Sequence, residues 1–237
     1  MYGIENQTIS LDRSRSQAGT LFLAKVFNWM AIGLGLTGLS ALLVAGSPTL
    51  SRVIFGNPLL FYGLIFGELG MVLFLSARLD RISASTATGL FLAYSVLNGV
   101  TLSVILLRYT GTSVAATFFV TAGMFVAMAV YGTVTKKDLT SMGSFLFMGL
   151  VGMVIASLVN IFIGSSMVSW VVSAIGVIVF TGLTAYDVQK ISRMGEAGIM
   201  AGGEAAIRKG AIMGALALYL DFVNLFLSLL QFMGDRR

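Results

Sequence analysis

The chain has 237 residues, of which 57% are hydrophobic and only 11% are charged. A soluble domain carries roughly 25% charged residues, so this composition indicates an integral membrane protein. The chain contains neither His nor Cys, which excludes disulfides, thiolate or imidazole metal sites and a Ser-His-Asp triad. Its net charge of +5 is expected in cytoplasmic loops rather than on a nucleic-acid-binding surface.

Hydropathy divides the chain into a polar N-terminal tail, residues 1–18, and a transmembrane domain, residues 19–237. The tail lacks the apolar core of a secretory signal. Seven later runs have the roughly 20 apolar residues that a spanning helix needs. These runs cover 23–45, 59–77, 86–107, 113–134, 144–163, 167–188 and 211–233. They predict an all-α protein of seven transmembrane helices, because runs this long without alternation are not typical of barrel strands.

Basic residues outside the apolar runs predict the orientation in the membrane. The tail side carries Arg13, Arg15, Lys25, Arg78, Arg81, Lys136, Lys137, Lys190, Arg193, Arg208 and Lys209. The opposite side carries only Arg52, Arg108, Arg236 and Arg237. Because basic residues concentrate in cytoplasmic loops, we expect a multi-pass membrane protein with a cytoplasmic N-terminus. The C-terminus then lies outside, unless the last segment re-enters the membrane.

Three acids, Glu68, Asp187 and Asp221, lie within the apolar runs. A carboxylate at the bilayer centre costs about 2.5–3.5 kcal/mol even on the lenient insertion scale, so such acids are functional candidates. Asp221 belongs to a small and polar stripe on the last segment, where a spacing of three and four residues selects one helical face. The stripe consists of Gly214, Ala217, Asp221, Asn224, Ser228 and Gln231. We therefore expect that face to meet other helices or water.

The other two acids differ in depth. Asp187 ends the sixth run near its cytosolic end, with Thr184 one turn before it. Glu68 lies centrally in the second run on an otherwise apolar face. Arg78 lies three turns further along at a neighbouring helical angle, whereas Arg81 points nearly opposite to Glu68. Arg78 is therefore the better candidate to reach a buried acid.

Other polar and small residues in the spans have ordinary packing explanations. Tyr94, Asn98 and Thr101 form a polar patch on the third run, which interhelical hydrogen bonding explains. Gly63 and Gly67 form a GxxxG pattern in the second, which is typical of close helix packing.

Two carboxyl groups that lie close together cannot both ionise cheaply and instead share a proton. Such a pair could bind a hard cation such as Ca²⁺ in a proton-gated channel, relay protons for solute transport, or form an intramembrane aspartyl protease dyad. The protease is disfavoured, because the presenilin-type GxGD motif is absent: Leu218, Tyr219 and Leu220 precede Asp221. We therefore expect no enzyme and no cofactor.

Four segments resemble the transmembrane Bax-inhibitor-motif family, in particular its bacterial branch. They are LNGVTLS, VNIF, FTGLTAYDVQKI and LALYLDFVNLFLSLLQFMG, within a resemblance from about 18 to 233. The resemblance implies six helices wrapped around a central seventh, and a pH-sensitive calcium leak channel. Asp187 and Asp221 would be its pH-sensing pair and transient Ca²⁺ ligands. It also implies an arginine latch on Asp187, at Arg78 or Arg81.

The combined hypothesis is a channel in the inner (plasma) membrane that conducts Ca²⁺ or a similar cation, with protons as its regulator. In its closed state Asp187 pairs with Arg78 or shares a proton with Asp221. Glu68, Asn224 and Ser228 are candidate pore-lining residues. The alternative, taken from other bacterial relatives, is an interaction protein that binds and modulates a membrane protease or another membrane assembly. Its partners would engage the tail and the loop 189–209.

Overall fold

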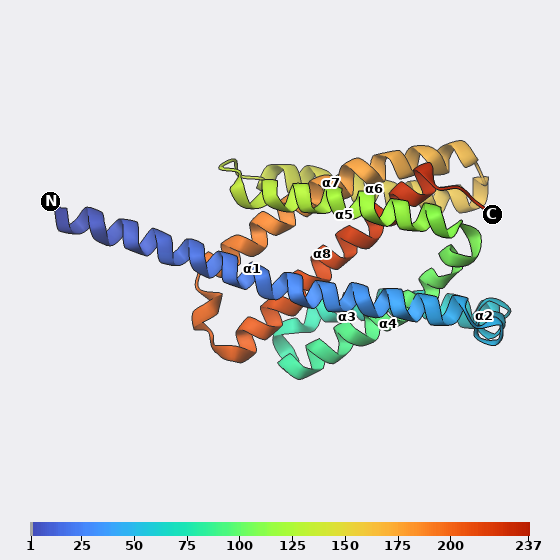
Figure 1. The fold of residues 1–237 in the computed structure, drawn as a ribbon, viewed down its shortest axis with the longest axis horizontal. Coiled ribbons are helices and arrows are strands. Elements are labelled where there is room, and N and C mark those ends of the chain that lie inside the picture. Colours follow the sequence, from blue (N-terminus) through green and yellow to red (C-terminus); the bar gives the residue numbers. More distant parts are fainter. Residues whose placement is uncertain (1) are drawn as a thin grey trace. The chain divides into compact units, whose positions relative to one another are not determined.

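In the computed structural model, the described residues fold into helices, and seven of these helices are long and apolar enough to cross a membrane (Figure 1). The backbone is described for residues 2–237, and side chains for residues 14–79 and 81–237. The helices are α1 (Tyr2–Ala45), α2 (Pro48–Phe55), α3 (Pro58–Arg78), η1 (Leu79–Arg81), α4 (Ala84–Arg108), α5 (Gly111–Val134), α6 (Thr140–Ile163), α7 (Ser166–Glu196), η2 (Ile199–Ala201) and α8 (Gly203–Met233). The predicted all-α membrane fold is confirmed.

Helix ends outside the apolar cores differ from the hydropathy boundaries. α1 begins at Tyr2, so the polar tail continues the first helix, while Met1 and the side chains of residues 2–13 lie outside the described residues. α7 extends to Glu196 and α8 begins at Gly203. The expected long connection over 189–209 is therefore mostly helical and contains only a short turn.

Local sequence signals explain the breaks between the first helices. The Ser47 hydroxyl accepts a hydrogen bond from the Leu50 amide at 3.4 Å, and Pro48 begins α2. The Asn57 side chain accepts one from the Leu60 amide at 3.2 Å, and Pro58 begins α3. A polar N-cap followed by Pro starts a helix, because Pro lacks the amide hydrogen that the first turn leaves unpaired.

The chain divides into two compact units, which we describe separately. The first unit comprises Met1–Ile105 and Lys190–Leu216. Within it, α1 packs closely on α4: the Thr37 hydroxyl donates a hydrogen bond to the Ser95 carbonyl oxygen at 2.8 Å. A Cβ at Gly99 would meet the backbone of Thr37. Absence of a side chain at this position thus permits the close approach.

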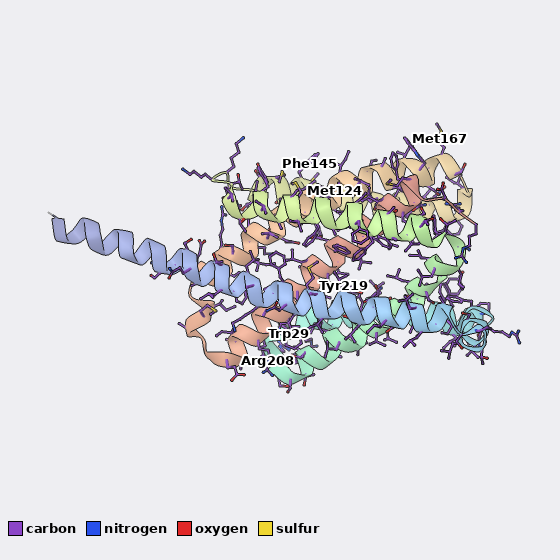
Figure 2. All side chains as sticks on the ribbon, viewed as in Figure 1. Trp29, Met124, Phe145, Met167, Arg208 and Tyr219 are labelled. Carbon is purple, nitrogen blue, oxygen red and sulfur yellow. The ribbon has the colours of Figure 1, made fainter. Side chains whose placement is uncertain are left out.

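The second unit comprises Leu106–Gln189 and Ala217–Arg237. Here α5, α6 and α7 lie side by side (green to orange in Figure 1). Its apolar core contains Leu146, Val179, Phe180, Leu183, Leu225 and Leu229. The outer surfaces of α6 and α7 expose large apolar side chains, among them Phe145 and Met167, 71% and 76% exposed (Figure 2). Exposed apolar side chains on a long apolar helix are suited to contact with lipid.

Burial is uneven among the seven spans. In α8, 67% of the most apolar window is buried, compared with 6–39% in the other six. Within the polar stripe of α8, Gly214, Asp221 and Ser228 are buried, whereas Gln231 is exposed. The expected arrangement of six helices around α8 stays a prediction.

Candidate functional site

The carboxyl groups of Asp187 on α7 and Asp221 on α8 lie within interaction distance of each other in the second unit. Asp221 is only 5% exposed, and Asp187 is partly buried. The Oδ2 atom of Asp221 is buried and accepts no hydrogen bond from any residue that the structure describes. A hydrogen bond between two carboxyl groups requires a proton on one of them. The arrangement can therefore hold one proton between two acids, or attract a cation in its place.

Glycines on neighbouring helices determine where α7 lies near Asp187. A Cβ at Gly132 of α5 would meet the backbone carbonyl oxygen of Ala185, and a Cβ at Gly143 of α6 would meet the ring of Tyr186. Both contacted residues precede Asp187 within one helical turn. The backbones of α5 and α6 thus approach α7 at the level of the acid, which limits how far Asp187 can shift without moving the helix.

Gln189 connects the end of α7 that carries Asp187 to the loop between α5 and α6. Its side-chain carbonyl accepts a hydrogen bond from the Leu139 amide at 2.9 Å, and its amide group donates to the Lys137 carbonyl oxygen at 2.8 Å. Gln189 is 6% exposed. Gln189 lies within the segment FTGLTAYDVQKI, but the sequence pattern indicates no role for it, because its partners lie about fifty positions earlier in the chain.

Glu68 belongs to the first unit and has neutral hydrogen-bonding partners on α4. The Asn98 amide donates to Glu68 Oε2 at 3.1 Å, and the Thr101 hydroxyl donates to Oε1 at 3.0 Å. Glu68 is 8% exposed. The acid and the polar patch of the third span, which the sequence pattern did not connect, form one buried cluster.

Comparison with known proteins assigns the chain to a family. The model described as "Inhibitor of apoptosis-promoting Bax1" matches residues 20–237. The chain belongs to the Bax-inhibitor family. It is 50% identical over 216 residues to the inner membrane protein YbhL of Escherichia coli K12, covering 91% of this chain and 92% of that protein. It is 43% identical over 232 residues to an uncharacterised protein of Rickettsia prowazekii, covering 97% and 96%.

These relatives and the seven spans support a multi-pass protein of the inner membrane. The relatives' names assign no transported ion and no partner. Which side of the membrane the N-terminus of this Bax-inhibitor-family protein occupies remains the prediction made from its basic residues.

The remaining predicted site residues fall in different parts of this Bax-inhibitor-family protein. Arg78 ends α3 and Arg81 lies in η1, both with exposed side chains in the first unit. Since Asp187 belongs to the second unit, the latch stays a prediction. Asn224 and Ser228 lie on α8 in the second unit, further along the stripe that contains Asp221. The Asn224 amide donates to the Leu220 carbonyl oxygen at 2.8 Å.

Proposed function

We propose that this Bax-inhibitor-family protein is a pH-sensitive leak channel for Ca²⁺ or a similar cation, with Asp187 and Asp221 as its proton sensor. The observation that carries the proposal is the close approach of these two carboxyl groups on membrane-spanning helices. The contact persists only while at least one proton remains on the pair, since two ionised carboxylates repel each other. Its stabilising contribution is present at low pH and is lost as the pH rises.

Loss of the proton would change both the charge and the packing at this point. Two anions in contact in a low-dielectric site repel each other strongly, which drives α7 and α8 apart at Asp187 and Asp221. The same two anions attract a divalent cation, whose preferred ligands are carboxylate and amide oxygens. One deprotonation event would thus both separate the helices and create a transient Ca²⁺ site. The latch candidates Arg78 and Arg81 would compete for Asp187 in the closed state.

The test is ⁴⁵Ca²⁺ uptake into proteoliposomes, measured between pH 5 and pH 8 for Asp187→Asn and Asp221→Asn. An amide retains hydrogen bonding but does not titrate, so we expect each variant to lose the pH dependence of flux. Asp138→Asn is the matched control, because Asp138 is an exposed acid of the same unit, whose side chain accepts a hydrogen bond from the Thr140 amide. Folded Asp187→Asn and Asp221→Asn proteins with wild-type flux at every pH would refute the proposal.

One observation favours the alternative of a regulatory interaction protein. α1 contains 44 residues, which corresponds to a length of about 66 Å at 1.5 Å per residue, whereas a bilayer core is about 30 Å thick. More than half of this helix can therefore extend beyond the hydrocarbon region and present a polar surface to a membrane protease or another assembly. A membrane partner that co-purifies with the full chain, is lost when residues 2–18 are deleted, and accompanies a protein without ion flux would favour this role.

A further inference from the structure

A groove with one polar wall lies between α6, α7 and α8 in the second unit. It consists of two adjoining cavities of about 300 and 430 Å³, which share Ser157, Ile161, Val172 and Gln231. The polar wall continues inward along α7 and α8 through Ser173, Ser228 and Asn224. The rest of the lining is mostly apolar and includes Leu150, Met153 and Phe180.

Several polar side chains of the groove have no internal partner. Ser157, Ser228 and Gln231 form no side-chain hydrogen bond within the part of the chain that the structure describes. By contrast, the Ser173 hydroxyl donates to the Ser169 carbonyl oxygen at 2.8 Å. An unpaired polar group is costly in contact with acyl chains and is satisfied in contact with water. The distribution of unpaired groups along the groove thus favours water over lipid.

The mouth of the groove lies at the α6–α7 turn, close to the end of α8. Asn160 organises this turn: its amide group donates to the Ser169 hydroxyl at 2.8 Å, and its side-chain carbonyl accepts from the Ser165 amide at 3.0 Å. Nearby, the rings of Trp170 and Phe232 lie 5.1 Å apart, and both are partly exposed. Because Trp is enriched at the membrane–water interface, this pair indicates that the mouth opens at that level.

The inner end of the groove approaches the carboxyl pair without reaching it. Asn224 lines the groove, and Asp221 lies three positions before it on the same helical face. Phe180, which also lines the groove, belongs to the apolar core together with Leu183 and Leu225. The Phe180 ring therefore separates the polar wall of the groove from the region of Asp221.

We propose that this groove is a water-filled vestibule, entered from the side of the membrane opposite the α5–α6 loop, that carries hydrated cations to Asn224. Phe180 closes its inner end. The cation as cargo rests on the proposed function, whereas the presence of water in the groove does not. A close approach of helices supports the vestibule: at Gly176 of α7, a Cβ would meet the Ser228 hydroxyl. α7 and α8 are thereby held close together beside the groove, at a point where Ser228 is 8% exposed.

The absence of Cys from the chain permits a direct test with single cysteines. Gln231→Cys, Ser228→Cys and Asn224→Cys would be reacted in sealed vesicles with a membrane-impermeant cationic thiosulfonate. The matched control is Ile178→Cys on α7, because the Ile178 side chain is apolar and 70% exposed. Only a hydrated thiol forms the reactive thiolate, so we expect Ser228→Cys to react at least about tenfold faster than Ile178→Cys. Lys136→Cys in the α5–α6 loop should react only from the opposite side.

Reaction of Gln231→Cys together with inert Ser228→Cys and Asn224→Cys would overturn the vestibule and indicate a lipid-filled groove. If Ser228→Cys fails to fold, Ser157→Cys serves in its place, because Ser157 is exposed within the same cavities. The attached positive charge should also abolish most of the Ca²⁺ flux. Labelling without loss of flux would overturn the cation route. Flux that is insensitive to Asp187→Asn and Asp221→Asn would refute only the channel's proton sensor.

Discussion

Glu68 and the pair Asp187–Asp221 are buried carboxyl groups within membrane spans, yet they have opposite kinds of partners. Glu68 accepts hydrogen bonds from an amide and a hydroxyl, at 3.1 and 3.0 Å. Asp221 lies next to another acid, Asp187, and its Oδ2 atom is unpaired among the described side chains. Neutral donors stabilise a carboxylate without a further ion, whereas an acid–acid contact depends on a proton or a cation. The second arrangement is the one suited to respond to pH.

The helices that carry these acids are also held differently. α7 is approached by the glycines of α5 and α6 next to Asp187, whereas α3 has open space around Gly63, Gly67 and Gly70 in the described part of the chain. Only 11% of the apolar window of α3 is buried, compared with 33% in α7. Backbone packing thus positions Asp187, whereas Glu68 connects α3 to α4 by side-chain hydrogen bonds.

The largest expected effect separates the two kinds of glycine. Gly132→Ala places a Cβ against the Ala185 carbonyl oxygen, and a backbone contact can be relieved only by moving a helix. We expect a loss of about 2–3 kcal/mol in the free energy of unfolding, measured in mixed micelles. Gly67→Ala, where the space is open, should gain up to about 1 kcal/mol from helix propensity. Equal effects of the two substitutions would mean that α5 does not position α7.

A smaller effect is expected where α3 meets α4. Glu68→Ala removes the acceptor on α3 of the Asn98 amide and the Thr101 hydroxyl, at a cost of about 1–2 kcal/mol in the free energy of unfolding. Glu68→Gln retains an acceptor oxygen and should cost less than about 1 kcal/mol. Both are measured by thermal unfolding in the same micelles. If Glu68→Gln is as destabilising as Glu68→Ala, the negative charge matters more than the hydrogen bonds.

Much of the fold could be predicted because spanning helices depend on a summed property, the apolar content of about 20 consecutive residues. All seven runs fall within the observed helices. The helix ends beyond the bilayer carried no such signal. α7 continues through Lys190 and Arg193 to Glu196. Hydropathy does not detect this extension, because polar residues outside the apolar core can continue a helix.

Contacts between helices were harder to predict. Gly63 and Gly67 were expected to pack closely against another helix, but no other described atom lies within 4 Å of a Cβ built at either position. The expectation was wrong within this chain, because a GxxxG pattern permits close approach without specifying a partner. Glu68 and Asn98 are thirty positions apart, so no local spacing connected them. Both aspartates, in contrast, were identifiable simply as acids in apolar runs.

The smallest expected effect concerns the Thr101 hydroxyl, which has one hydrogen but lies 3.0 Å from both Glu68 Oε1 and the Asn98 carbonyl oxygen. Removing it by Thr101→Val should cost about 0.6 kcal/mol, the average for interhelical hydrogen bonds in a membrane protein. In a double-mutant cycle with Glu68→Ala, most of this cost should disappear, because the hydroxyl returns to its backbone acceptor once the acid is absent.

Thr121→Val is the control, since the Thr121 hydroxyl donates to the Thr117 carbonyl oxygen within its own helix, at 2.7 Å. Its cost should be unchanged by Glu68→Ala; equal coupling of both threonines to Glu68 would show that the cycle reports general loosening rather than the α3–α4 contact.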